Sequence, residues 1–414
     1  MSGTRGRRAV DLHRRTFAAL RHRNYRLFWF SQLVSLTGTW MHSVAQGWLV
    51  LELTSQPFWL GAVGAATTLP VLVFSLFGGV AADRLPKRSL LIATQSVSAV
   101  VALALGLLAL RGQVQVWQVL AAALLLGMAN ALDLPARQSF VVEMVGREDL
   151  LNAIALNSLT FNAARIIGPA VAGTIVAAAG TATCFLVNAA SFAPVIAALA
   201  LMRGLPAAPR AAGGSVAAHL REGFAYAARE RRFQGLIALV AAGSFFGFPC
   251  VTLLPSFARD VLHTDARGYG ALMAVTGVGA IVSVLVLAAR QRSGVGGAVV
   301  VVAGLVFGAA LALFAASRSF LTAVPLLTVA GAAMVAQAAT ANTLVQSTVP
   351  DALRGRIMSM FTLVLMGAMP LGNLLIGALA GLIGTMAAVA IFGTSLCAAI
   401  GLIALARREV FAKA

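Results

Sequence analysis

The chain has 414 residues, of which 60% are hydrophobic and 11% are charged. A soluble domain carries about 25% charged residues, and several apolar runs here reach the roughly 20 residues that cross a bilayer. The composition therefore indicates a polytopic membrane protein and leaves no room for a large soluble domain. The net charge of +18 could suit a nucleic-acid-binding protein, but the cations lie at helix ends and in short loops, which argues against that class.

Twelve membrane-spanning helices are predicted, in two sets of six. The first six cover 27–51, 58–81, 90–110, 116–134, 152–178 and 182–202. The second six cover 234–258, 268–289, 298–317, 320–345, 357–381 and 385–406. Connections such as Gly180-Thr181 and Gly384-Thr385 are very short. Tight connections make successive helices antiparallel neighbours, so we expect a compact helical bundle.

The long connection 203–233 divides the chain near its midpoint. It opens with Pro206, Pro209 and a glycine pair, and then alternates apolar residues with cations. That second part predicts an amphipathic helix on the membrane surface. The expected organisation is a basic N-terminus (1–26), a first half (27–202), this linker (203–233), a second half (234–406) and a tail (407–414).

The distribution of basic residues predicts the topology. Cations gather in the N-terminus, in the loops on one side of the predicted spans and in the tail. In the loops on the other side stand only Arg111, Arg259, Arg267 and Arg318, and Arg165 lies inside a span. By the positive-inside rule, both termini are cytoplasmic. Contact of the N-terminal arginines with anionic lipid is a further expectation.

The two halves carry a weak internal repeat. Pro169 and Gly180 are separated by the same interval as Pro370 and Gly381. Gln138-Ser139 and Gln346-Ser347 fall in corresponding loops. These matches favour a duplicated six-helix unit, an architecture in which transporters place the substrate site between the two repeats.

Three motifs carry a resemblance to a known family. Residues 78–88 read GGVAADRLPKR and match the pattern GxxxDRxxRR, with Lys87 where Arg is common. Residues 164–173 read ARIIGPAVAG, and residues 350–359 read PDALRGRIMS. On these residues the chain resembles the major facilitator superfamily, within the branch of bacterial exporters that includes enterobactin-type siderophore exporters and Tap-like drug efflux proteins.

The resemblance implies an all-α polytopic membrane protein of the major facilitator fold, with twelve transmembrane helices in two six-helix halves. It implies a multi-pass location in the bacterial cytoplasmic (inner) membrane and exchange of substrate for protons. Gly168, Pro169 and Gly173 resemble the antiporter motif of the family, although Ala172-Gly173 stands where that motif has paired glycines.

Asp83 is the basis of a predicted conformational latch. An acid beside the C-terminal end of a helix is unfavourable unless a cation or another helix N-terminus compensates it. The resemblance suggests that Asp83 pairs with Arg137 and faces the start of the eleventh helix, with Arg84 and Arg88 in the same loop. The alternative is a solvated acid among cations that only anchor the topology.

Polar residues inside the spans predict a substrate cavity. The first helix carries a stripe on one face, which lipid does not tolerate and which therefore faces the bundle or water. Arg165 is a cavity cation for an anionic substrate or a partner of the proton site. The alternatives are a structural arginine bonded to backbone carbonyls and an arginine that extends to the cytoplasmic surface. Polar packing between helices is the alternative for the others. The predicted cavity residues are Gln32, Thr39, His42, Gln46, Asn162, Arg165, Gln337 and Asn342.

Three titratable residues near or within the spans are candidates for proton coupling: His42, Glu52 and Asp133. Each has a simpler alternative. His42 can be a packing residue, Glu52 can end its span in water, and Asp133 can form a local pair with Arg137, which lies four residues later.

The sequence favours a secondary active exporter of a small amphipathic solute, a drug or a siderophore, working by proton antiport and alternating access. An importer or proton symporter on the same fold is the alternative, and a membrane-embedded enzyme or lipid transferase is a more distant one. The three cysteines have no metal-binding spacing, and we expect no metal, no cofactor and no catalytic residue. The expected partners are the solute, protons and membrane lipids, and we expect a monomer.

Overall fold

The computed structural model describes residues 17–204, 230–290 and 296–407. Within these ranges, the side chains of 75–84, 290, 351–352 and 354–356 are outside the description. The predicted amphipathic helix of the linker falls largely on 205–229 and lies outside the described residues.

The first half is built from long antiparallel helices. A short 3₁₀ helix, η1 (Ala18–Arg21), precedes α2 (Arg23–Thr54), α3 (Pro57–Arg84), α4 (Lys87–Leu110), α5 (Val116–Val145) and α6 (Leu150–Leu201). The last of these contains two spans, because Gly180 adopts φ 76° and ψ 170° within it. Only glycine takes that conformation without strain, so the break predicted at Gly180-Thr181 is confirmed.

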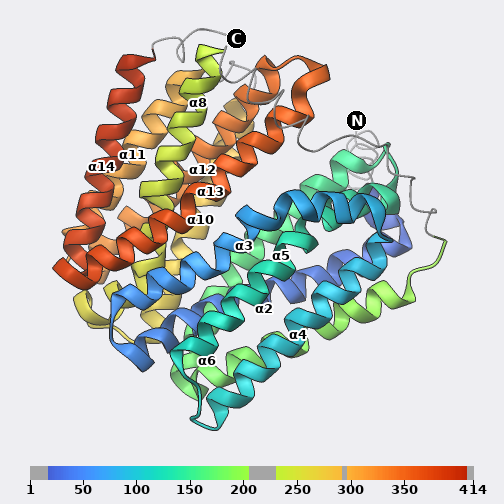
Figure 1. Cartoon of the computed structure of the whole chain (residues 1–414), viewed down its shortest axis with the longest axis horizontal. Coiled ribbons are helices and arrows are strands. Elements are labelled where there is room, and N and C mark those ends of the chain that lie inside the picture. The colour runs from blue at the N-terminus through green and yellow to red at the C-terminus, as the bar shows by residue number, and fades with distance from the viewer. Residues whose placement is uncertain (1–16, 205–229, 291–295, 408–414) are drawn as a thin grey trace, which may run out of the picture.

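The second half also supplies six spans. Its regular helices are α10 (Ala266–Arg290), α11 (Gly297–Ala315), α12 (Phe320–Thr348), α13 (Asp351–Ile383) and α14 (Thr385–Ala406). Figure 1 shows the two halves side by side, α2–α6 in blue to green and α8–α14 in yellow-green to red. The prediction of twelve spans in two halves is confirmed.

The seventh span differs from its prediction as one helix over 234–258. It is a column of short segments: α8 (Arg231–Ala242), the π-helix η2 (Gly243–Gly247), the 3₁₀ helix η3 (Phe248–Leu253), α9 (Leu254–Ser256) and the π-helix η4 (Phe257–Val261). Pro249 and Pro255 lie within this column. Proline has no N–H for the helical ladder, so the hydrogen-bond pattern shifts around each ring.

Two other helices are longer than predicted. The fourth was expected to end at 134, before Pro135, but α5 continues through Pro135 to Val145. The eleventh was expected to begin at 357, but α13 begins at Asp351. In both cases the helix extends beyond its apolar stretch on the cytoplasmic side.

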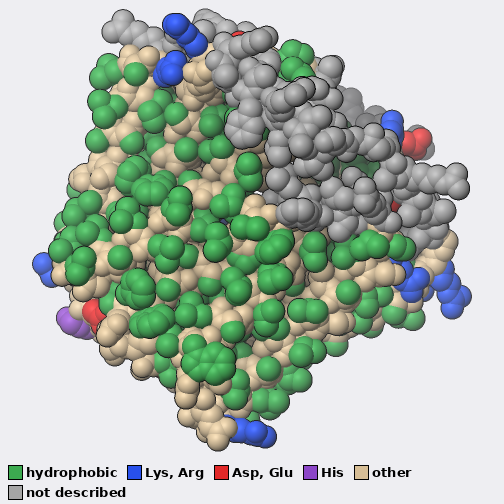
Figure 2. Space-filling model, viewed as in Figure 1, with side chains coloured by type: hydrophobic (Ala, Val, Ile, Leu, Met, Phe, Trp, Pro, Cys, Tyr) green, Lys and Arg blue, Asp and Glu red, His purple; other side chains and the backbone are tan. Residues whose placement is uncertain are grey.

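The surface of the described part suits lipid. Ten of its helices are long and apolar enough to cross a membrane, with α6 long enough for two spans. The polar stripe on α2 lowers its hydropathy, and this 32-residue helix is not among the ten. Figure 2 shows a face covered by hydrophobic side chains, with charged ones at its margins.

The two halves meet tightly at their outer ends. A Cβ on Gly61 of α3 would lie 2.7 Å from the Cα of Gly377 on α13, and a Cβ on Gly173 of α6 would lie 3.1 Å from the Cα of Gly270 on α10. Arg259 Nη1 donates a hydrogen bond of 3.1 Å to the carbonyl oxygen of Leu51, across the same boundary. The structure is therefore closed toward the outer side.

Candidate functional site

A buried acid and an arginine one turn apart form the centre of a polar network in the first half. Asp133 on α5 is only 3% exposed. Its Oδ2 accepts a hydrogen bond from Arg137 Nη2, and Arg137 Nη1 donates to Gln32 Oε1 on α2 at 2.9 Å. The local Asp133–Arg137 pair expected from the sequence is confirmed, and it ties α5 to α2.

The second carboxylate oxygen of Asp133 binds α4. Thr94 Oγ1 donates to Asp133 Oδ1 at 2.9 Å, and Gln95 Nε2 donates to the same atom at 2.8 Å. A buried carboxylate needs such donors to offset its lost hydration. Sequence reasoning missed Thr94 and Gln95, although two adjacent polar residues in an apolar span were a signal. Gln32, Thr94, Gln95, Asp133 and Arg137 are called the inner polar network below.

A hollow of about 160 Å³ adjoins this network. It lies between α2, α5 and α6, and its polar lining includes Gln32, Arg137, Asn157 and Thr160. A water molecule occupies about 30 Å³ in the liquid, so the hollow has room for several waters. Buried Arg137 Nε and Gln95 Oε1 have no hydrogen-bond partner within the described part of the chain. The inner polar network thus has unpartnered polar atoms, and the hollow beside it is large enough to hold water.

The predicted latch is only partly visible. The side chains of Asp83 and Arg84 lie outside the described residues, so the Asp83–Arg137 pair stays a prediction. Arg88 Nη2 donates to the carbonyl oxygen of Ala200 on α6 at 2.7 Å, and Arg137 belongs to the inner polar network. Both described latch residues therefore bind within the first half.

Lys87, which the sequence suggested only as a topology cation, forms a buried ion pair. Its Nζ lies 2.5 Å from Glu143 Oε1 on α5, and the Lys87 side chain is only 6% exposed. The pair joins the cytoplasmic ends of α4 and α5. Sequence reasoning missed it because Glu143 lies beyond the predicted end of the fourth helix.

Arg165 lies between the two halves, midway along the first span of α6. Its Cζ is 5.9 Å from the centroid of the Trp40 ring on α2. Its stem packs on the second half, since a Cβ on Gly277 of α10 would lie 3.4 Å from Arg165 Cγ. Its guanidinium has no ion pair or hydrogen bond with any residue that the structure describes. Asn162, one turn earlier, donates to the carbonyl oxygen of Ser158 at 2.8 Å and is partly exposed.

The remaining polar stripe of α2 divides into exposed and buried residues. Thr39 is exposed and donates to the carbonyl oxygen of Ser35 at 2.9 Å. His42 is 3% exposed, and its ring packs edge-on against Phe185 at 4.8 Å. Neither ring nitrogen of His42, nor Gln46 Nε2, has a partner among the described residues. His42 and Gln46 thus lie inside the first-half bundle.

The other predicted residues lie apart from this region. Gln337 is 2% exposed and donates to the carbonyl oxygen of Leu239 at 3.0 Å, in the core of the second half. Asn342 accepts from Gln346 on its own helix. Glu52 is exposed near the outer end of α2. Packing between helices accounts for Gln337, which the sequence had placed in the cavity.

The antiporter-like residues are sites of close helix contact. A Cβ on Gly168 would lie 2.5 Å from Trp40 Cβ, and one on Gly173 would lie 2.6 Å from the carbonyl oxygen of Ala266 on α10. Pro169 is buried between them. Gly168 therefore seats α6 on α2 within the first half, and Gly173 seats it on the second half.

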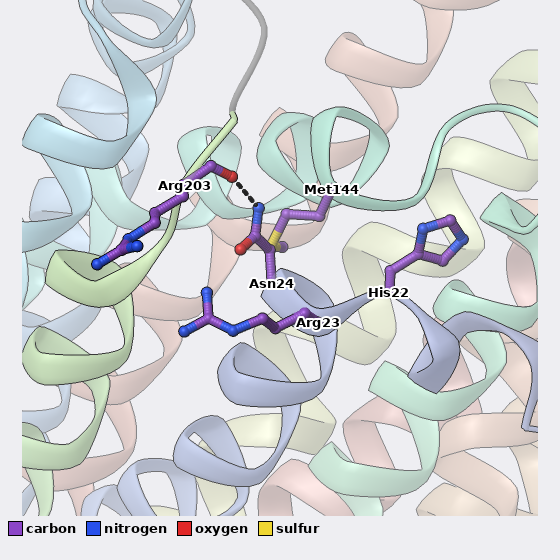
Figure 3. Close-up of a pocket in the computed structure, with 5 residues that line it drawn as sticks. All are labelled: His22, Arg23, Asn24, Met144 and Arg203. Carbon is purple, nitrogen blue, oxygen red and sulfur yellow. Dashed lines mark hydrogen bonds between the residues drawn. The ribbon is translucent and has the colours of Figure 1, made fainter.

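A basic hollow of about 530 Å³ opens at the cytoplasmic end of the first half. It is lined by His22, Arg23, Asn24, Met144 and Arg203 (Figure 3). Asn24 Nδ2 donates to the carbonyl oxygen of Arg203 at 2.8 Å, which ties the start of α2 to the end of α6. The side chains of Arg23 and Arg203 extend on the same side of Asn24 in Figure 3. Their charges suit the lipid contact that the N-terminal cations predict.

Comparisons with known proteins agree with this architecture. A family model described as transmembrane secretion effector matches residues 14–412. The multidrug efflux pump Tap of Mycolicibacterium fortuitum is 30% identical, over 86% of this chain and 89% of that protein. The staphyloferrin A transporter of Staphylococcus aureus is 26% identical, over 89% and 92%. The crystal structure of the nucleoside transporter NupG superposes with a TM-score of 0.75 at 15% identity, over 93% and 99%.

Proposed function

Because the chain belongs to the transmembrane secretion effector family of major facilitator transporters, we propose that it exports a small amphipathic solute, a drug or a siderophore, in exchange for protons. The coarser statement is established: it is a multi-pass transporter of the bacterial cytoplasmic membrane, related to drug and siderophore transporters. The direction, the substrate class and the coupling ion are the proposal.

The relatives support export. One is named a multidrug efflux pump and matches along most of both chains. Another is named a transporter of staphyloferrin A. Both names describe movement of small organic molecules, which suits a chain whose described residues combine an apolar exterior with a few polar groups between helices.

The contacts between the halves support alternating access. The outer seal is made by glycines, Gly61 on Gly377 and Gly173 on Gly270, with backbone against backbone. Glycine contacts of this kind need no side chain to move, and separation there also breaks the hydrogen bond from Arg259 to the carbonyl oxygen of Leu51. The halves can then close at the opposite end. Rocking of two repeats about a central site is the expected motion of this architecture.

The inner polar network carries the proposal of proton coupling. Of the three candidates, Glu52 is exposed at the outer end and His42 is packed against Phe185. Among the described residues, Asp133 is the candidate that forms a direct ion pair, with Arg137. Protonating Asp133 removes the charge that holds Arg137, and the guanidinium is then free to turn into the adjoining hollow. That movement would also change the bond between Arg137 and Gln32 on α2.

Flux measurements in proteoliposomes test this proposal. A panel of amphipathic dyes and ferric chelators is offered under an imposed pH gradient. Accumulation when the lumen is acidic indicates exchange, whereas accumulation when the outside is acidic indicates symport and contradicts the proposal. Asp133→Asn should abolish gradient-driven flux but preserve exchange of solute for solute. Asp260→Asn is the matched control, because Asp260 pairs with Arg259 at the outer end. Unchanged gradient-driven flux in Asp133→Asn would exclude Asp133 as the proton carrier.

A further inference from the structure

We propose that Arg165 and Trp40 form an anion-binding subsite on the transport path, and that the solute carries a carboxylate or a similar planar anionic group. The inference rests on the proposed transport function for its biological meaning. It concerns binding, however, and can be tested without any flux.

Arg165 has no counter-charge among the described residues. A cation at the centre of a membrane helix costs roughly 2.5–3.5 kcal/mol on insertion scales. Proteins normally offset that cost with an acid, but Asp133 is committed to Arg137 and Glu143 to Lys87. No described residue forms an ion pair with Arg165. A cation–π contact contributes about 0.5–2 kcal/mol, so Trp40 does not complete the compensation.

Arg165 also lies far from both ends of its span. Arg165 lies about 22 Å along the helix axis from Leu150, near the midpoint between Leu150 and the break at Gly180. The head of Arg165 lies beside Trp40, which is itself near the midpoint of α2 (Arg23–Thr54). The guanidinium therefore stays at mid-depth in the bundle instead of extending along α6 toward either end.

Arg165 is placed at the boundary between the two halves. The stem of Arg165 rests on Gly277 of the second half, while its head lies by Trp40 of the first. It thus spans the boundary at the level where the two repeats of such transporters bind substrate. Trp40 also contacts Phe161 edge-on at 5.9 Å, and Phe161 is 46% exposed. Phe161 in turn lines the hollow beside the inner polar network.

These groups define a class of ligand. A guanidinium presents a planar fork of donors that matches a carboxylate with two parallel hydrogen bonds. Trp40 and Phe161 offer apolar faces next to that fork, and the same two helices carry the partly exposed polar residue Asn162 and the exposed residue Thr39. The site therefore suits an anionic head on an apolar or aromatic body, and it disfavours a purely cationic drug.

Quenching of Trp40 fluorescence tests whether anions reach Arg165. The full chain in nanodiscs retains Trp40, and Trp29, Trp48, Trp59 and Trp117 are replaced by phenylalanine. Iodide, an anion, and acrylamide, which is neutral, are compared. Arg165→Gln should lower the iodide quenching constant several-fold and leave the acrylamide constant unchanged, and Arg165→Lys should retain most of the iodide effect. Arg111→Gln, which removes an exposed arginine at the outer end of α4, is the matched control and should change neither constant.

Equal iodide quenching with and without Arg165 would overturn the subsite, and so would a Trp40 that neither quencher reaches. The proposed ligand class is tested by measuring the binding of two dyes, rhodamine B, which has a free carboxylate, and its ethyl ester, which does not. Wild-type protein should prefer the acid, and Arg165→Gln should weaken binding of the acid about tenfold while leaving the ester unchanged. Equal binding of the two dyes to the wild type would contradict the proposed ligand class.

The two proposals fail in different ways. If iodide and the acid dye bind through Arg165 but no solute moves under a pH gradient, the exporter proposal fails and the subsite stands. If proton-driven flux is robust and unaffected by Arg165→Gln for every solute, the exporter stands and the subsite fails.

Discussion

The two halves share an architecture but differ in where they keep charge. In the first half, Asp133 pairs with Arg137 within α5, and Lys87 on α4 pairs with Glu143 on α5. Across the described part of the second half, the fully buried polar residues are neutral, as at Gln337. Its charged groups lie near the ends of the spans, with Arg232 at the start of α8 and the ion pair Arg259–Asp260 exposed at the outer end. Charge that can respond to protons or to a charged solute is thus concentrated in the first half.

The two halves also differ in the regularity of their first spans, and here the second half is the irregular one. The first span of the first half, α2, is one continuous helix of 32 residues. The first span of the second half, from Arg231 to Val261, changes between α, π and 3₁₀ geometry. Irregular turns within a helix are points where it can bend. The comparison suggests that the first half supplies the ionic chemistry and the second half supplies the bending.

Removing the buried acid should give the largest effect. Asp133→Ala leaves Arg137 as an uncompensated buried charge, and breaking such a pair costs about 3–5 kcal/mol. Gln337→Leu in the second half removes one neutral hydrogen bond, and we expect a loss of about 1 kcal/mol. Unfolding in detergent, followed by circular dichroism, measures both. Similar losses in the two variants would break the contrast between the halves.

Removing the second ion pair, Lys87–Glu143, should give the next largest loss of stability. Lys87→Met leaves Glu143 without its partner, and we expect a loss of about 1.5–3 kcal/mol, as for a hydrogen bond to a charged group. Arg259→Met removes the exposed pair at the outer end, where such pairs contribute about 0–1 kcal/mol, together with the hydrogen bond to the carbonyl oxygen of Leu51. The same unfolding assay compares the two. A larger loss in Arg259→Met would mean that the outer pair, rather than the inner one, secures the fold.

Glycine contacts give a conformational test of the boundary between the halves. Gly61→Val adds atoms where a Cβ already meets Gly377 Cα at 2.7 Å, and overpacking of this kind costs about 1–3 kcal/mol. Because separating the halves relieves the clash, the population should shift toward the outward-open form. Spin-label distances across the outer ends of α3 and α13 measure the shift. Gly401→Val is the control, since a Cβ there meets nothing within 4 Å.

The sequence alone predicted those features that depend on residues close together in the chain. Gly180 requires a positive φ, so its break in α6 could be placed to the residue. The Asp133–Arg137 pair follows from one-turn spacing on a helix. The positions of the spans follow from apolar length. In each case the relevant partners lie within a few residues along the chain.

The features that the sequence did not predict depend on packing between helices that are distant in the chain. Thr94 and Gln95 meet Asp133 only because α4 packs on α5, and Gln337 lies in the core because the carbonyl oxygen of Leu239 on α8 accepts from it. No rule of residue spacing predicts either contact from a single sequence. Pro135 and Pro249 show the same limit for the backbone: α5 continues through the first, while the span around the second changes its helical geometry.

The smallest predicted effect concerns the cytoplasmic end of the first half. His22 Nε2 lies 2.8 Å from Asp149 Oδ2 at the start of α6, with Arg21 Nη2 at 3.4 Å. The hydrogen bond from His22, aided by the charge of Arg21, lowers the pKa of Asp149 below its usual value. A lowered folded-state pKa stabilises the contact above the unfolded value of about 3.9, and this stabilisation is lost as pH falls through the lower folded value.

The amide of Ala19 reports this contact, because its N–H donates to Asn152 Oδ1 at 2.9 Å beside Asp149. Hydrogen exchange over Ala18–His22, corrected for intrinsic rates, should be constant from about pH 7 to about pH 5 and should accelerate below about pH 4. Asp149→Asn should remove the acceleration and leave exchange faster at every pH. Because the group is near water, salt should weaken the effect. An acceleration below about pH 4 that persists in Asp149→Asn would show that the contact does not depend on the Asp149 carboxylate.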